Sequence, residues 1–150
     1  NAEARTYGQH AFASGFFSAG PPFFGVAQTS TFVLRRTTTD NTPTELHPDG
    51  DDALHRMTLA ENSTWTFDIL VVGRRADGAS SGCKVVGVIE NDGGATSLVG
   101  SPIVSQVGAG PCGAAVEADD VNDALIVMVS GFNNADIRWV AVVRTAEVIH

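Results

Sequence analysis

Two clusters of acidic residues are the first places in this sequence where chemistry could occur. One cluster comprises Asp49, Asp51 and Asp52, and the other comprises Asp119, Asp120 and Asp123. Paired carboxylates carry out glycoside hydrolysis, one as the acid and the other as base or nucleophile. Short acidic side chains are also frequent in turns, where they accept hydrogen bonds from nearby backbone N–H groups. Since no facing partner is evident for either cluster, we expect solvated turns and no catalytic pair.

Metal binding is the second chemistry that these residue types could support. Asp119, Asp120, Asn122 and Asp123 could supply the oxygen ligands that Ca²⁺ prefers. Neither acidic cluster matches the D-x-[DN]-x-[DN]-G calcium loop, so we expect no metal. Among the four histidines (His10, His47, His55 and His150), His47 precedes a proline in a turn and is expected at the surface.

Motifs for nucleophiles and cofactors are missing. The sequence contains no G-x-S-x-G elbow, and the glycine-rich segment 108–111 is followed by no lysine and opens no helix, unlike a phosphate loop. Cys83 and Cys112 are too far apart for a metal site and have no nearby histidine. They could form one disulfide, but a single pair is not a disulfide framework, and we favour two buried thiols. We predict no catalytic residue, no cofactor and no enzyme.

Composition places the chain among folded proteins and excludes some partners. Its 150 residues suit one domain, with 43% hydrophobic and 17% charged residues. The formal charge of −8, with eight arginines and one lysine among nine basic residues, argues against nucleic acid as a partner. No apolar run approaches the roughly 20 residues that span a bilayer, so we predict no membrane insertion. No signal peptide is recognisable and the chain does not begin with Met; we expect it to be part of a longer protein.

The elements that would position any site are strands. Residues 64–69 alternate so that Trp65, Phe67 and Ile69 share one face, which is typical of a strand with one buried face. Similar patterns cut by Gly, Asp, Asn and Pro predict strands at 29–39, 44–46, 55–59, 64–75, 83–90, 96–99, 114–118, 125–129 and 137–148. Segment 100–113 holds four glycines and two prolines and is expected to be a loop. We predict an all-β antiparallel sandwich or jelly roll over residues 28–150.

Residues 1–27 differ from the rest of the chain. This segment is rich in glycine and alanine and holds six of the eleven aromatic residues, namely Tyr7, Phe12, Phe16, Phe17, Phe23 and Phe24. A short irregular arm cannot bury these side chains within itself, and a large apolar patch is rarely left in water. We predict a stalk end whose aromatics form the interface of a homotrimer. The alternative is an arm folded back on its own head domain.

Several segments carry a resemblance to a known family. They are residues 25–30, 37–46, Trp65-Thr66-Phe67 with 71–75, and Ile137-Arg138-Trp139-Val140-Ala141. Together they resemble the C-terminal domains of bacteriophage and prophage tail fibres, in which a repetitive stalk ends in a trimeric β-sandwich head. Segment 8–15 is also similar to the G-x-x-A-x-A-x-G repeats of trimeric β-roll adhesin heads. These motifs are structural, so no catalytic or binding residue is carried over.

The resemblance implies a location and a function. The chain would lie in the tail fibre of a virion and act outside the cell as a receptor-binding adhesin for host attachment. In such trimers an axial histidine sometimes binds an ion, and His10 is the candidate here. The partner would be a glycan or outer-membrane component of the host surface, with polysaccharide favoured.

Loops on a rigid sandwich are where recognition usually occurs, and the segment between the last two predicted strands joins an aromatic to polar side chains. We therefore predict receptor binding by Phe132, Asn133, Asn134 and Asp136. Trp65 and Trp139 alternate with apolar neighbours and are expected in the core or an interface. Two alternatives stay open: a structural trimerisation cap that touches no receptor, and a monomeric carbohydrate-binding module of a secreted enzyme with a planar aromatic platform.

Overall fold

The computed structural model describes residues 1–15, 17, 25–50 and 54–150. In these residues all regular structure is β-strand, as the sequence predicts, and no helix is available to cross a membrane. The strands are β1 (His10–Phe12), β2 (Ala27–Thr38), β3 (Thr44–Leu46), β4 (Met57–Thr58), β5 (Ser63–Arg75), β6 (Ser80–Asp92), β7 (Ala95–Leu98), β8 (Ile103–Gln106), β9 (Ala114–Asp119), β10 (Ala124–Val129) and β11 (Ile137–Ile149).

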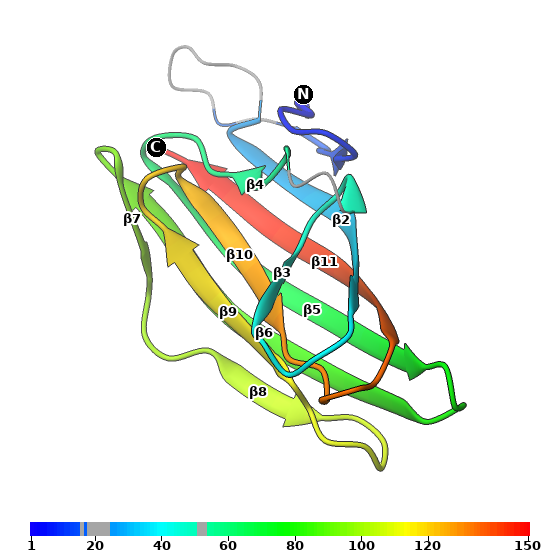
Figure 1. Cartoon of the computed structure of the whole chain (residues 1–150). Coiled ribbons are helices and arrows are strands. Elements are labelled where there is room, and N and C mark those ends of the chain that lie inside the picture. The colour runs from blue at the N-terminus through cyan, green and yellow to red at the C-terminus, as the bar shows by residue number, and fades with distance from the viewer. Residues whose placement is uncertain (16, 18–24, 51–53) are drawn as a thin grey trace.

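The strands form two antiparallel sheets. The large sheet has the order β1-β2-β11-β5-β6, and β7 and β8 both pair with β6. In the small sheet β10 pairs with β9 on one edge, and with β3 and β4 on the other. The small sheet lies across one face of the large sheet (Figure 1). Both termini lie at one end of this sandwich, and the β5–β6 and β10–β11 connections lie at the other end (Figure 1).

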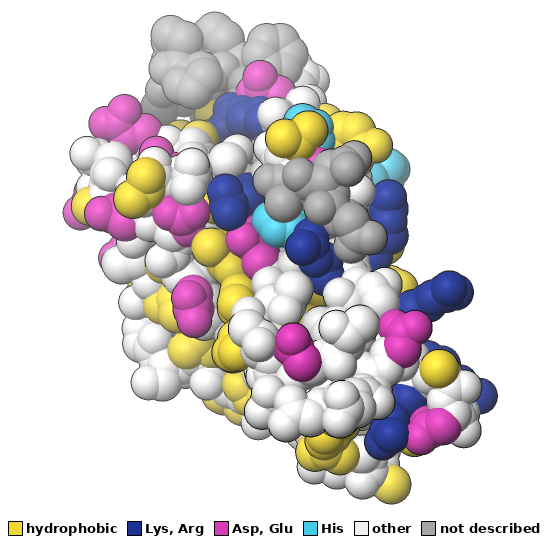
Figure 2. Space-filling view, viewed as in Figure 1, with side chains coloured by type: hydrophobic (Ala, Val, Ile, Leu, Met, Phe, Trp, Pro, Cys, Tyr) yellow, Lys and Arg dark blue, Asp and Glu magenta, His cyan; other side chains and the backbone are white. Residues whose placement is uncertain are grey.

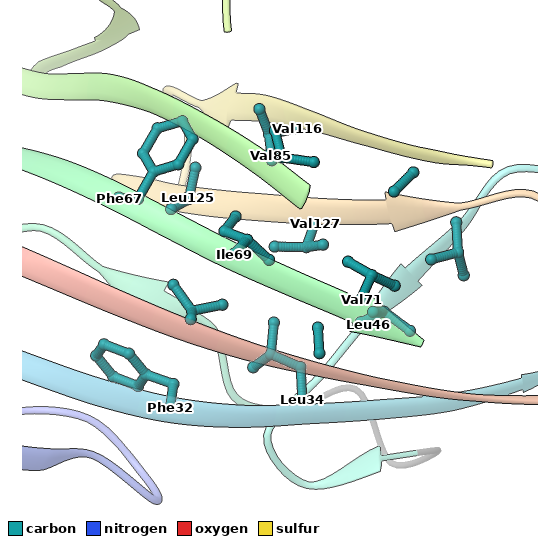
Figure 3. Packing of buried hydrophobic residues seen from close by; sticks show 14 of the residues in the cluster. Phe32, Leu34, Leu46, Phe67, Ile69, Val71, Val85, Val116, Leu125 and Val127 are labelled. Carbon is teal, nitrogen blue, oxygen red and sulfur yellow. The ribbon is translucent and has the colours of Figure 1, made fainter. Parts of the chain in front are cut away.

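The core fills the space between the two sheets. Strands β2, β5 and β11 alternate buried and exposed residues, so every second side chain points at the small sheet. Phe67 and Ile69 of the large sheet face Leu125 and Val127 of β10 across the core (Figure 3). Trp65 and Trp139 are both buried, which confirms their predicted place in the core.

Two cross-strand pairs place an aromatic ring over a glycine. Trp139 lies opposite Gly73, and Phe67 lies opposite Gly87. A Cβ added at either glycine would come within 2.5 Å of the opposite ring. The Trp139 indole Nε1–H also donates to Thr38 Oγ1 at 2.9 Å. These glycines are therefore part of the packing, because only their lack of a side chain makes room for the rings.

The predicted pair of free thiols is wrong, because Cys83 and Cys112 form a disulfide. Cys83 belongs to β6 of the large sheet, and Cys112 lies just before β9 of the small sheet. Folding brings these segments to a Cα–Cα separation of 5.3 Å, within the normal range for a disulfide. The bond joins the two sheets covalently, although 29 positions separate the cysteines in sequence.

Two further expectations need correction. Segment 100–113 contains a strand, β8, because its residues 103–106 carry no glycine or proline and pair with the free edge of β6. His47 is only 3% exposed instead of lying at the surface. It exchanges backbone hydrogen bonds with Arg35, and its ring lies against Glu45 and the carbonyl of His55.

The described part of the N-terminal arm packs on its own chain. Strand β1 pairs with β2, and Gln9 Nε2 donates to Ser30 Oγ at 2.7 Å. The Gln28 side-chain oxygen accepts from the Glu3 N–H, and its Nε2 donates to the Glu3 carbonyl. The same Nε2 also donates to the Glu147 carboxylate at 2.7 Å. The fold-back alternative therefore holds for these residues, while the division of the chain at residue 27/28 and the trimer stay predictions.

Candidate functional site

The end of the sandwich away from the termini carries the predicted recognition loop. Phe132, Asn133, Asn134 and Asp136 all lie in the connection from β10 to β11 and are exposed. The N–H of Ala135 donates to the carbonyl of Phe132, which closes the turn at 3.2 Å. Asn134 has a φ of 58°, a left-handed conformation that Asn and Gly tolerate better than other residues. The loop therefore has a defined shape with its amides facing solvent.

This loop forms one wall of a polar hollow of about 660 Å³. The opposite wall is the β2–β3 turn, and the lining residues are Thr39, Asp40, Asn133, Asn134, Ala135 and Asp136. The hydrogen bonds that Thr42 donates hold the pKa of the Asp40 carboxyl below its usual value. Asp40 is therefore an ionised acceptor at neutral pH, beside amides that both donate and accept. Sugar hydroxyls are bound by such mixtures of donors and acceptors.

The ring of Phe132 packs against an arginine. The Arg75 guanidinium lies over the Phe132 ring, 5.7 Å from its centroid, and also pairs with Asp77 at 2.8 Å. A second, smaller hollow of about 210 Å³ adjoins this stack and is lined by Arg74, Arg75, Ala76, Asp136 and Arg138. Because Asp136 lines both hollows, the polar loop and the arginines form one continuous surface.

The sequence motifs give no direct sign of the arginine hollow. Arg74-Arg75 is visible as a pair, but Arg138 lies 64 positions later. The register of β11 on β5 places Arg138 opposite Arg74. Only knowledge of which strands are neighbours, and in what register, could have joined these residues.

Part of the outer face of the large sheet is a second candidate surface, and this part is apolar. Val142 lies opposite both Val33 and Leu70, and Val140 lies opposite Val72. Leu70, Val72, Val140 and Val142 line a hollow of about 500 Å³ whose lining is almost entirely apolar. An antiparallel sheet with one uncovered face normally shows polar residues there. An apolar face of this kind is typical of an interaction site.

Of the aromatic residues predicted to form the trimer interface, Phe12 lies on this face. Phe12 pairs with Thr29, an outward residue of β2, so its ring points to the same side as Leu70 and is 61% exposed. Tyr7 and Phe17 are also exposed, and Tyr7 stacks on His55 with centroids 4.7 Å apart. Phe16, Phe23 and Phe24 lie outside the described residues.

The acidic turn at 119–123 is built from local hydrogen bonds. Asp119 accepts from the backbone N–H groups of Val121 and Asn122 and from the Asn122 amide. Asp120 and Asp123 accept from the backbone and hydroxyl of Thr96. Within the described part of the chain no three His, Cys, Asp or Glu side chains group as a metal site. His10 is exposed on β1.

Comparison with known proteins gives a distant similarity to a solved structure. No protein-family model and no curated protein matches the chain. Among solved structures, the chain is similar to a "tailspike protein gp49 from Acinetobacter baumannii bacteriophage Fri1, a capsular polysaccharide depolymerase", with 14% identity and a TM-score of 0.49. The likeness covers 92% of this chain and 19% of that chain, so this chain spans about a fifth of its length. A likeness at this level carries no information on what this chain binds.

Proposed function

We propose that this chain is the receptor-binding head of a bacteriophage tail fibre, which assembles as a homotrimer and binds a polysaccharide of the bacterial surface. The observation that carries the proposal is the polar hollow between Asp40 and the Asn133-Asn134 loop, at the end of a rigid sandwich. This end lies away from the N-terminal arm, where a fibre stalk would join (Figure 1). The head acts without catalysis, as a binding module on the virion.

Binding by such a head gains strength from repetition. Three shallow sites per fibre bind a repeating polysaccharide together, so weak single contacts add up to firm attachment. The open, shallow character of the hollow suits weak contacts, since its lining is more polar than apolar and offers hydrogen bonds.

The trimer would use the apolar outer face of the large sheet. Phe12, Leu70, Val72 and Val140 lie exposed on this face. Its occupant is a second copy of this chain, because Phe12 of the N-terminal arm is exposed on the same face as the apolar sheet residues. The expected solution mass is about three times the 15.6 kDa of one chain.

Light scattering tests the assembly. Leu70→Ser with Val140→Ser is expected to reduce the mass to that of the monomer, whereas Val121→Ser, at a remote and almost fully exposed position, should leave the trimer intact. A wild-type chain that is monomeric at all concentrations would contradict the trimer. The monomeric carbohydrate-binding module would then be favoured, with Phe132 as its aromatic contact in place of the buried Trp65 and Trp139.

Binding is tested with loop variants that keep the turn. Asn134→Gly removes the amide but tolerates the positive φ, and Asn133→Ala removes the neighbouring amide. We expect both to weaken binding to an array of purified bacterial capsular and O-chain polysaccharides, and to reduce adsorption to host cells. Asn62→Gly, which replaces another positive-φ asparagine in the turn before β5, is the matched control. Unchanged adsorption of both loop variants would favour the purely structural cap.

A further inference from the structure

We propose that Arg74 and Arg138, supported by Arg75, form a subsite for the carboxylate of an acidic sugar. The inference rests on the proposed function, since it names the chemical class of the glycan: a polysaccharide that contains uronic or similar acidic residues. The subsite is the 210 Å³ hollow beside the polar loop, and Ala76 and Asp136 complete its lining.

The strand register places the two arginines together. Arg138 of β11 lies directly opposite Arg74 of β5, and both are exposed on the outer face of the large sheet. Residues opposite one another on antiparallel strands have Cβ atoms about 5 Å apart. Arg74 is oriented by a hydrogen bond to Ser80 Oγ at 3.0 Å. Arg75 is held by Asp77 and the Phe132 ring. Arg74 and Arg75 are therefore oriented before any ligand arrives.

The protein neutralises only part of the positive charge in the hollow, because Asp77 pairs with Arg75 and Asp136 is the one carboxylate in the lining. Among the described residues Arg138 forms no hydrogen bond or ion pair through its side chain, and Asp136 is in no ion pair although it lines the same hollow. Like charges directly opposite on a sheet are unfavourable. A bound anion would remove this repulsion. A carboxylate fits best, because its two oxygens match the fork of a guanidinium group.

The distribution of charge over the molecule supports the same ligand class. Arginine side chains lie at the end where β5 stops and β11 starts, with acidic side chains between them, and several acidic side chains lie at the opposite end near the β6–β7 turn (Figure 2). In a chain of net charge −8, three of the eight arginines line this one hollow, which gives an acidic polymer a local site of positive charge. Asp136 and the Asn133-Asn134 amides next to the hollow would bind the hydroxyls of the same or the next sugar.

Nuclear magnetic resonance of the full chain tests the subsite. The probe is sodium glucuronate, titrated while the arginine Nε–Hε signals are followed, with glucose as the neutral counterpart and glucose 6-phosphate as the alternative anion. We expect saturable shifts at Arg74 and Arg138 with glucuronate and none with glucose. Arg138→Gln should weaken the binding about tenfold or more, as expected for loss of a charged hydrogen-bond donor, whereas Arg138→Lys should weaken it less.

Arg144→Gln is the matched control. Arg144 lies on the same strand and the same outer face, but it is opposite Asp68 instead of an arginine. Like Arg138, it forms no hydrogen bond or ion pair through its side chain among the described residues. Equal shifts at Arg144 and Arg138, or no saturable shift, would overturn the subsite. Saturation by glucose 6-phosphate alone would overturn the choice of a carboxylate.

The outcomes separate this inference from the proposed function. Array binding to neutral polysaccharides that depends on Asn133 and Asn134 but not on Arg138 would refute the subsite and keep the receptor role. Saturable glucuronate binding at Arg138 without any effect of the loop variants on adsorption would keep the subsite and refute receptor binding through the loop.

Discussion

Arg138 of β11 and Arg74 of β5 lie directly opposite each other in the large sheet, with both side chains on its outer face. Only nine of the 150 residues are basic, so this pairing uses two of the few cations available. Opposed like charges lower the stability of a sheet. Because the Arg74–Arg138 pair lowers stability and lies beside a hollow, we interpret it as part of a binding surface.

The first prediction concerns the stability cost of this pair. Arg138→Gln removes the repulsion, and we expect it to raise the free energy of unfolding by about 0.2–1 kcal/mol. Arg144→Gln removes an arginine opposite Asp68, so it should leave the stability unchanged or lower it. Urea denaturation at low ionic strength measures both changes. Added salt should shrink the difference, since it screens exposed charges. A destabilised Arg138→Gln would show that Arg138 supports the fold instead.

The second prediction concerns the glycine under Trp139. Gly73→Ala adds a Cβ that would lie 2.5 Å from the indole, so the ring must move and the core must repack. We expect a loss of about 1–3 kcal/mol in the free energy of unfolding, as for other overpacked cores. Gly15→Ala is the control, because among the described residues no atom beyond its chain neighbours lies within 4 Å of its added Cβ. An unchanged thermal midpoint for Gly73→Ala would mean that the indole has room to shift.

Most of the fold could be predicted from alternation and turns. The run at 64–75 gave a strand within one residue of β5, and the predicted strand at 83–90 lies within β6. Strand β8 could not be predicted, because its four residues stand between glycines and prolines and are ordered by the edge of β6. Burial of His47 depended in the same way on a partner distant in sequence, Arg35.

The site was predictable in part. The turn residues between two clearly predicted strands pointed to the candidate loop Phe132–Asp136. Asp40 and the adjoining arginines lie beside this loop only because of the register of β2, β11 and β5, which the sequence does not show. The apolar outer face did have a signal in the sequence. Residues 69–72 and 140–143 are unbroken apolar runs, which indicate strands covered on both faces.

The third prediction concerns the disulfide. Cys83–Cys112 closes a loop with a sequence separation of 29 and ties β6 to the segment before β9. Replacing both cysteines by alanine is expected to lower the free energy of unfolding by about 2–4 kcal/mol. Urea denaturation of the oxidised chain, the reduced chain and the double variant measures this loss. The reduced chain and the variant should agree, and added reductant should not affect the variant. Equal stability of all three would contradict a stabilising bond.

The fourth prediction concerns acid and the turn at Asp119. The hydrogen bond from the Asn122 side-chain amide holds the pKa of the Asp119 carboxyl below its ordinary value. The backbone N–H groups of Asn122 and Val121 and the charge of Arg56 lower this pKa further. A carboxyl whose pKa is lower in the folded state stabilises the fold above its unfolded pKa, and this stabilisation is lost as pH falls through the folded pKa. Asp119→Ala should therefore cost about 1 kcal/mol near neutral pH and much less near pH 2. Urea denaturation across this range measures the difference, and Asn122→Ala should reproduce part of it. A cost that does not depend on pH would show that the turn needs the shape of the aspartate and not its charge.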